Sequence, residues 1–156
     1  MEKEEWMKRA IALAVENARS GLGGPFAALV VKDNRIVATG INAVTSSNDP
    51  TAHAEMLAIR AACRRLESFQ LHGCEIYTSC EPCPMCLGAI YWARPAAYYF
   101  ACSRECASQA GFDDGFIYRE LTVPAASRSI PGYSLLPESG MEPFVEWSRN
   151  PNKAGY

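Results

Sequence analysis

Two short motifs, about thirty residues apart, carry the residue types that bind a metal ion and activate water. The first is His53-Ala54-Glu55, and the second is Pro82-Cys83-Pro84-Met85-Cys86. Zinc prefers imidazole nitrogen and thiolate sulfur in a tetrahedron, so His53, Cys83 and Cys86 are the candidate metal ligands. Three protein ligands leave the fourth position of the tetrahedron to water, which is typical of a catalytic site.

Glu55 is the candidate catalytic residue. Zinc lowers the pKa of a bound water to about 7, and a carboxylate that is not a ligand can carry the water proton to a substrate. Residues two apart on a helix point to nearly opposite sides, so His53 and Glu55 meet one ion only off the helix end. Cysteines three apart in a first helical turn also aim at one point, where the helix N-terminus favours the thiolate. The spacing predicts that two helix N-termini converge on the metal.

Two other interpretations of the cysteines involve redox chemistry. A C-x-x-C pair is also typical of thioredoxin-like proteins, but that interpretation leaves His53 and Glu55 unexplained. The C-x-x-C-x-x-C run of Cys80–Cys86 is similar to an iron–sulfur motif. A ferredoxin-type run would need a fourth cysteine near position 90, where Ile90 stands. Cys80 is instead expected to pack beside the metal loop.

The remaining cysteines have less specific surroundings. A structural zinc ribbon needs a second closely spaced pair, for which Cys102 and Cys106 are a poor candidate. Cys63, on an alanine-rich helix, and Cys74, at the start of a strand, are expected to be small core residues. His72 is expected in an exposed loop rather than at a metal.

Hydrophobic periodicity predicts the elements that must position the motifs. Helices are expected at 2–20, 52–66 and 84–92, with shorter ones at 104–110, 113–119 and 141–149. Strands are expected at 26–32, 35–41, 74–79 and 96–101. Asp33-Asn34 fits a two-residue hairpin turn, and Thr51 is the expected N-cap of the second helix. The order implies a three-layer α/β domain whose mixed sheet is antiparallel in the first hairpin and parallel after it.

Composition and charge indicate what kind of molecule the protein binds. The chain has 156 residues, a net charge of −2 and seven cysteines. The length suits one compact domain, and the absence of a clustered basic face favours a small-molecule substrate over nucleic acid. No apolar run reaches about 18 residues, and the polar start lacks the features of a signal peptide. A cytoplasmic protein with reduced or metal-bound cysteines and no membrane association is therefore expected.

The residues from Asn48 to Glu55 and from Cys80 to Ile90 resemble the cytidine and deoxycytidylate deaminase superfamily, whose signature pairs H-x-E with P-C-x-x-C. Segments 89–95 and 111–114 and the ending at Tyr156 are similar to bacterial guanine deaminases of the small zinc type, and the likeness covers nearly the whole chain. It implies a cytidine-deaminase-like α-β-α fold with a mixed five-stranded sheet. It also implies one Zn²⁺ per subunit and a homodimer.

The resemblance further implies a substrate pocket. Asn42 would donate and accept hydrogen bonds at the ring edge, and Phe26 would stack on the base. The Ala54 backbone would meet a polar group beside the reacting carbon. Asp114 would accept from the adjacent N1–H and N2–H donors of guanine. Asn42 is alternatively a turn residue and Asp114 a helix cap, the role expected of its neighbour Asp113.

Two aromatic residues complete the pocket that the resemblance implies. Trp92 would add an apolar wall, although it and Phe26 are alternatively core residues. The chain is expected to form a single catalytic domain, 1–156, whose segment of about 141–156 is exchanged between subunits. That exchange would bring Tyr156 over an active site as a lid.

The activity that the resemblance implies is the conversion of guanine to xanthine and ammonia. Deamination of adenosine in transfer RNA is a first alternative, and it requires a basic surface that the acidic pI of about 5.7 argues against. A cytosine or cytidine deaminase is a second alternative, decided by pocket contacts. A non-enzymatic zinc module is a third, against which Glu55 argues because a structural site needs no acid–base carboxylate.

Overall fold

A sheet with the strand order β2-β1-β3-β4 organises the first of two units of the chain. The computed structural model describes residues 2–156. By their internal contacts these fall into a first unit that ends at Gly115 and a second unit, Phe116–Tyr156. The four strands are β1 (Ala27–Lys32), β2 (Arg35–Ile41), β3 (Glu75–Cys80) and β4 (Ala97–Cys102).

The first hairpin forms as its sequence predicts. Strands β1 and β2 pair antiparallel, and Asp33 and Asn34 adopt φ values of 48° and 57°. Positive φ at both central residues gives the turn that matches the twist of the strands. The prediction for the rest of the sheet is half right, because β3 pairs parallel with β4 but antiparallel with β1.

The expected fifth strand is wrong for the part of the chain that the structure describes. After β4 the chain continues into the short helices α5 (Arg104–Gln109) and α6 (Gly115–Glu120). These stretches lack the alternating, β-branched pattern that a strand requires, so nothing in them competes with helix formation. The sheet therefore ends at β4.

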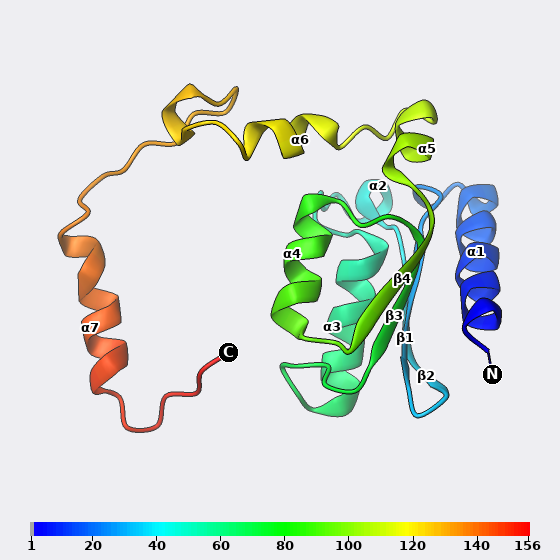
Figure 1. Cartoon of the computed structure of the whole chain (residues 1–156), viewed down its shortest axis with the longest axis horizontal. Helices are drawn as coiled ribbons and strands as arrows, with labels where there is room; N and C mark the ends of the chain where they lie inside the picture. The colour runs from blue at the N-terminus through cyan, green and yellow to red at the C-terminus, as the bar shows by residue number, and fades with distance from the viewer. Residues whose placement is uncertain (1) are drawn as a thin grey trace. The chain divides into compact units, whose positions relative to one another are not determined.

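Helices cover both faces of the sheet, which confirms the three-layer arrangement (Figure 1). Helix α1 (Lys3–Ser20) lies on one face, and α3 (Ala54–Leu66) and α4 (Pro84–Ala93) lie on the other. Alternate side chains of β1 pack into two hydrophobic cores, one on each face of the sheet. Ala28 and Val30 join the core under α3, and Leu29 and Val31 join the core under α1.

Helix α3 approaches β2 very closely at the end that carries His53. A Cβ atom placed on Gly40 would lie 2.0 Å from the carbonyl oxygen of Ala54. Only glycine fits there, and the buried face of α3 is built from the small residues Ala54, Ala58 and Ala62. This contact fixes the start of α3 against the sheet. The polar stretch expected as a loop at 42–50 contains one further short helix, α2 (Val44–Ser47).

The second unit has a different character. Beyond α6 it contains two short 3₁₀ segments, η1 (Ala125–Ser127) and η2 (Ser139–Met141), and helix α7 (Glu142–Arg149). None of its side chains is buried, although it carries many large apolar groups, among them Ile130, Leu135, Phe144 and Trp147. This unit has no core of its own. Across residues 2–156, no helix combines the length and apolar character needed to span a membrane.

Candidate active site

His53 stands directly before the first turn of α3. Its backbone is extended, with φ −72° and ψ 153°, and it occupies the N-cap position that was predicted for Thr51. That prediction is wrong because Thr51 bonds to Asp49, two residues before it in the chain, instead of capping α3. Its N–H and hydroxyl donate to Oδ1 of Asp49, at 2.8 Å and 2.7 Å. The helix thus begins one residue before Glu55, and His53 stays outside it.

Cys83 has the same position at the start of α4. It is the N-cap residue, Pro84 occupies the first turn, and the N–H of Cys86 donates to Sγ of Cys83 at 3.5 Å. A proline suits this turn because its missing N–H would have no acceptor there. Both metal-ligand motifs therefore open a helix, as their spacing predicts.

The three predicted metal ligands come together. Nδ1 of His53 lies 3.5 Å from Sγ of Cys83 and 3.4 Å from Sγ of Cys86. One donor atom from each residue lies within 4.8 Å of the others. A tetrahedral zinc with ordinary Zn–N and Zn–S bonds would separate nitrogen from sulfur by about 3.6 Å. The donor set therefore fits zinc in both chemistry and spacing.

The charges of this group suit a cation. The hydrogen bond from Cys86, together with that from His53, lowers the pKa of Cys83 to about 4. The partner thiol, Cys86, has a raised pKa because it is hydrogen-bonded to Cys83 and buried. The contact with Cys83 also raises the pKa of His53. The group thus carries a thiolate, which is the form of cysteine that binds metals.

Glu55 lies beside the metal ligands and is buried. Its Oε1 accepts a hydrogen bond from Oγ1 of Thr78 at 3.1 Å, and its Oε2 accepts one from Sγ of Cys86 at 3.5 Å. Burial raises the pKa of this carboxyl group. A carboxyl group that shares its surroundings with a metal donor set is in the right place to exchange protons with a substrate. Sequence reasoning placed Glu55 here but did not identify Thr78.

Asn42 is buried at the end of β2 with its orientation determined by the backbone. Its Oδ1 accepts from the N–H groups of Gly24 and Val44, each at 3.2 Å. Two donors occupy that oxygen, so the amide hydrogens on Nδ2 are what Asn42 can offer a ligand. The loop around it is held by Asn17 of α1. Nδ2 of Asn17 donates to the carbonyls of Gly24 and Asn42, at 2.8 Å and 2.9 Å.

Asn17 was not predicted to have a functional role, although its position on an apolar helix face could have indicated one. It is 3% exposed and sits on the face of α1 that also buries Ala10 and Ala14. A lone amide on an otherwise apolar helix face indicates a buried hydrogen-bonding role. Here that role is to join α1 to the segment that carries Asn42.

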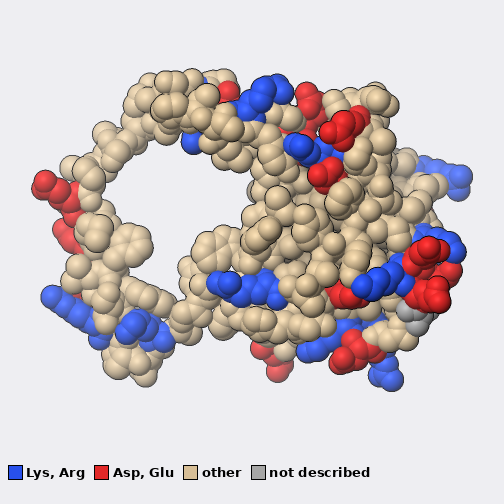
Figure 2. Space-filling view, in the orientation of Figure 1, with Lys and Arg blue, Asp and Glu red and all other residues tan. Residues whose placement is uncertain are grey.

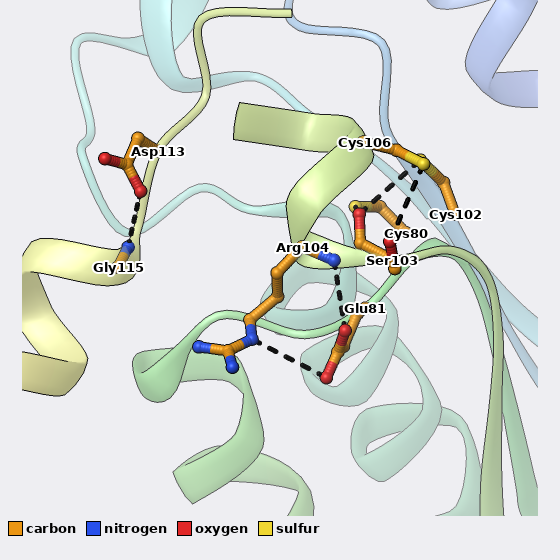
Figure 3. Close-up of polar contacts among 8 residues, drawn as sticks. All are labelled: Cys80, Glu81, Cys102, Ser103, Arg104, Cys106, Asp113 and Gly115. Atoms are coloured by element: carbon orange, nitrogen blue, oxygen red, sulfur yellow. Dashed lines mark hydrogen bonds and ion pairs between the residues drawn. The ribbon is translucent and has the colours of Figure 1, made fainter. Parts of the chain in front are cut away.

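Phe26 and Asp114 approach the same region from different segments. The ring of Phe26 meets that of Phe112 edge to face, with centroids 4.9 Å apart. Burial and the nearby Cys83 charge raise the pKa of Asp114. Its neighbour Asp113 has the capping role expected of it, since its Oδ1 accepts from the N–H of Gly115 at 2.8 Å (Figure 3).

The three other predicted substrate residues, Ala54, Trp92 and Tyr156, lie in different surroundings. Ala54 is fully buried in the first turn of α3, where its N–H has no acceptor within the helix. Trp92 is 61% exposed and lies six residues beyond Cys86, about 9 Å along the axis of α4. Tyr156 belongs to the second unit and is 72% exposed. The structure gathers Ala54 with the metal ligands, whereas Trp92 and Tyr156 stay predictions.

A polar brace supports the loop that carries Cys83 (Figure 3). The N–H of Glu81 donates to the carbonyl of Cys102 at 2.7 Å. Its carboxylate accepts from the N–H of Arg104 at 3.0 Å and pairs with the Arg104 guanidinium at 3.7 Å. The turn after β3 is thereby tied to the start of α5. Sequence reasoning did not single out Glu81 or Arg104.

The other cysteines are outside the group of three candidate donors. Sγ of Cys80 and of Cys102 each donate to the carbonyl of Ser103, at 3.9 Å and 3.6 Å, and the hydroxyl of Ser103 donates to Cys106 at 3.6 Å. Burial raises the pKa of Cys80 to about 12. Cys63 and Cys74 pack with the core under α3, as expected, and His72 is exposed.

Comparisons with known proteins agree with this geometry. Residues 1–102 match the family model of the cytidine and deoxycytidylate deaminase zinc-binding region. A guanine deaminase of Bacillus subtilis (strain 168) is 54% identical over 156 residues, which is the full length of both chains. The X-ray structure of guanine deaminase from Bacillus subtilis superposes with a TM-score of 0.97 at 54% identity, covering 100% of this chain and 99% of that one.

A more distant relative shares the catalytic region. A tRNA-specific adenosine deaminase of Aquifex aeolicus (strain VF5) is 45% identical over 94 residues, which cover 60% of this chain and 62% of the relative. The matched family region contains the whole donor set and Glu55. The chain therefore belongs to the cytidine and deoxycytidylate deaminase zinc-binding family.

Proposed function

We propose that this chain is a zinc-dependent aminohydrolase that converts guanine and water to xanthine and ammonia. The observation that carries the proposal is the three-ligand donor set of His53, Cys83 and Cys86 with the buried carboxyl group of Glu55 beside it. Three protein ligands are typical of catalytic zinc, whereas structural zinc takes four. Full-length identity of 54% to a curated guanine deaminase supports guanine as the substrate.

The chemistry divides between the ion and the chain. Zinc held by the three donors would act as a Lewis acid that makes water nucleophilic at neutral pH. Glu55 accepts the proton that the attacking water loses. It returns a proton to the ring nitrogen and then assists the departure of the amine as ammonia. Its burial excludes solvent and keeps those protons within the site.

The remaining residues bind and orient the purine. The Nδ2 hydrogens of Asn42 donate to an acceptor on the ring edge, and Phe26 stacks on the ring. The N–H of Ala54 meets a polar group beside the reacting carbon. Asp114 accepts from the adjacent N1–H and N2–H donors, which makes it the purine-selecting residue. Adenine lacks that pair of neighbouring donors.

Charge supports a small molecule over a transfer RNA as substrate. The net charge is −2, and the face in Figure 2 shows basic side chains interspersed with acidic ones. A protein that grips an RNA loop needs a continuous basic surface to neutralise phosphates. A freely diffusing purine in the cytoplasm needs none.

We also propose a homodimer in which the segment of about 141–156 is exchanged. The second unit buries none of its side chains although it carries Phe144 and Trp147, which are 64% and 45% exposed. Large apolar groups without a core are typical of a segment that packs on another subunit. The exchange would bring Tyr156 to an active site as a lid, with Trp92 forming an apolar wall of the pocket.

A substrate panel tests the proposed function. Purified protein is incubated with guanine, adenine, cytosine and cytidine, and ammonia is measured. We expect guanine to be the preferred substrate, and the Glu55→Gln variant to retain zinc while kcat falls about 10²- to 10⁴-fold. Asp114→Asn should lower kcat/KM for guanine and narrow its preference over adenine. Full activity of Glu55→Gln, or no turnover of guanine by the wild type, would contradict the proposal.

A further inference from the structure

Thr78 of β3 joins Glu55 to the loop that carries the candidate metal ligands. We propose that Thr78 is a positioning residue, whose hydroxyl holds the Glu55 carboxyl group with one oxygen turned toward the metal donor set. This inference rests on the proposed acid–base role of Glu55. It adds a residue outside both the H-x-E and the P-C-x-x-C motifs.

The contact is buried on both sides. Oγ1 of Thr78 lies 3.1 Å from Oε1 of Glu55, and the two residues are 1% and 6% exposed. At such a depth a hydrogen bond is not weakened by competing water, and a polar group that loses its partner is left unsatisfied. The interaction therefore has a large effect on the position of the carboxyl group.

The two carboxyl oxygens of Glu55 have different neighbours. Oε1 faces Thr78, and Oε2 lies 3.5 Å from Sγ of Cys86, which is one of the three metal donors. The terminal torsion of a glutamate side chain is broad, so its own rotamer preference does not select an orientation. A hydrogen bond at Oε1 does select one, and in that orientation Oε2 points to where the reaction takes place.

The same hydroxyl also reaches the metal loop. Oγ1 of Thr78 lies 3.0 Å from the carbonyl oxygen of Cys80, three residues before Cys83. A hydroxyl has one proton and two lone pairs, so Thr78 divides its donation between the carbonyl and Glu55. The general base on α3 and the loop that leads into α4 are thereby held at one point.

The sheet offers no immediate substitute for this hydroxyl. Ala28 of β1 and Phe100 of β4 are the in-register neighbours of Thr78, and neither carries a polar side-chain atom. Ser79 is also buried, but alternate residues of a strand face opposite sides of the sheet. Its Oγ accepts from the N–H of Ala27 at 3.1 Å, and it lines an apolar groove with residues of α1.

Three variants test the proposal. Thr78→Val removes the hydroxyl and keeps the shape, Thr78→Ser keeps the hydroxyl, and Ser79→Ala removes a buried hydroxyl from the opposite face. For guanine, we expect Thr78→Val to lower kcat about 10- to 100-fold with KM within about twofold and zinc still bound. Thr78→Ser should recover most of kcat. Ser79→Ala should keep the wild-type kcat.

A double-mutant cycle separates positioning from structural damage. If Thr78 acts through Glu55, Thr78→Val should cause little further loss of kcat in a Glu55→Gln background. Wild-type kcat in Thr78→Val, or an equal loss in Thr78→Ser, would overturn the inference. If Thr78→Val fails to fold, Thr78→Ala against Thr78→Ser repeats the comparison, since these variants differ only by the hydroxyl.

The proposed function and this inference fail in distinguishable ways. Retained activity in Glu55→Gln would remove the acid–base role itself, and the Thr78 inference with it. An inactive Glu55→Gln beside a fully active Thr78→Val would leave the proposed function intact and remove only the role of Thr78.

Discussion

Nδ1 of His53 lies 3.4 Å from Sγ of Cys86, although 33 residues separate them along the chain. The approach depends on two helices that begin at the same place, α3 directly after His53 and α4 directly after Cys83. Side chains that precede a helix or occupy its first turn project beyond its end. Two such ends therefore make a donor set that no single helix face can provide.

Serine substitutions should distinguish the metal-binding cysteines, Cys83 and Cys86, from the neighbouring Cys80. We expect Cys83→Ser and Cys86→Ser to lose zinc and activity together, because a serine hydroxyl is a poor ligand for zinc. Cys80→Ser is the matched control, since Cys80 lies outside the donor group and contacts the Ser103 carbonyl. Zinc per chain and ammonia release are the measurements. A Cys83→Ser variant with full zinc content would contradict the assignment.

Asn42 should contribute to substrate binding through its amide nitrogen. Asn42→Asp retains acceptor oxygens for the N–H groups of Gly24 and Val44 but removes the Nδ2 donor. Loss of one buried donor costs about 1–3 kcal/mol, so kcat/KM for guanine should fall about 5- to 150-fold. Zinc content should be unchanged. The control is Asn48→Asp, an exposed residue, and equal kcat/KM values in the two variants would rule out a binding role for Asn42.

Glu75 should stabilise the fold in a pH-dependent way. The hydroxyl of Tyr77, at 2.6 Å, holds the pKa of Glu75 below its ordinary value, with help from Lys3. A carboxyl group whose pKa is lower in the folded state favours folding while it is ionised. That contribution is complete above the unfolded-state pKa, about 4.3, and is lost as the pH falls through the lower folded-state value.

Urea unfolding of the zinc-free protein measures this effect. The midpoint of Glu75→Gln should lie below that of the wild type near pH 7, and the difference should shrink as the pH falls below about 4. Glu4→Gln, an exposed position on α1, is the control. A difference between Glu75→Gln and the wild type that stays constant from pH 7 to pH 3 would show that charge at Glu75 is not responsible.

The end of the chain should be needed for turnover but not for folding of the first unit. We expect removal of residues 151–156 to lower kcat while zinc content and the thermal midpoint stay close to those of the full chain. Refolding two variants together tests whether the segment is exchanged between subunits. Full-length Glu55→Gln would supply its intact tail to a truncated subunit with Glu55, so refolding the two together should restore activity. Unchanged turnover in the truncated protein would remove the lid role of Tyr156.

The grouping of the candidate site residues was predictable from short-range spacing. His53, Glu55, Cys83 and Cys86 are identified by residue type and by offsets of two and three positions, which local helix geometry converts into direction. The hairpin at Asp33 and Asn34 was predictable for the same reason, because a two-residue turn depends on its own backbone angles. These features need little information from the rest of the chain.

Tertiary structure decided what lies across the sheet. The pairing of β1 with β3 and the end of the sheet at β4 depend on which surfaces bury one another. The partners of Glu55 and Asn42 come from β3 and α1, and packing of the buried core aligns Thr78 and Asn17 with them. The sequence by itself determined which residues are candidates for the chemistry. Only the folded protein determined which neighbours orient them, because burial brings together groups that the chain keeps far apart.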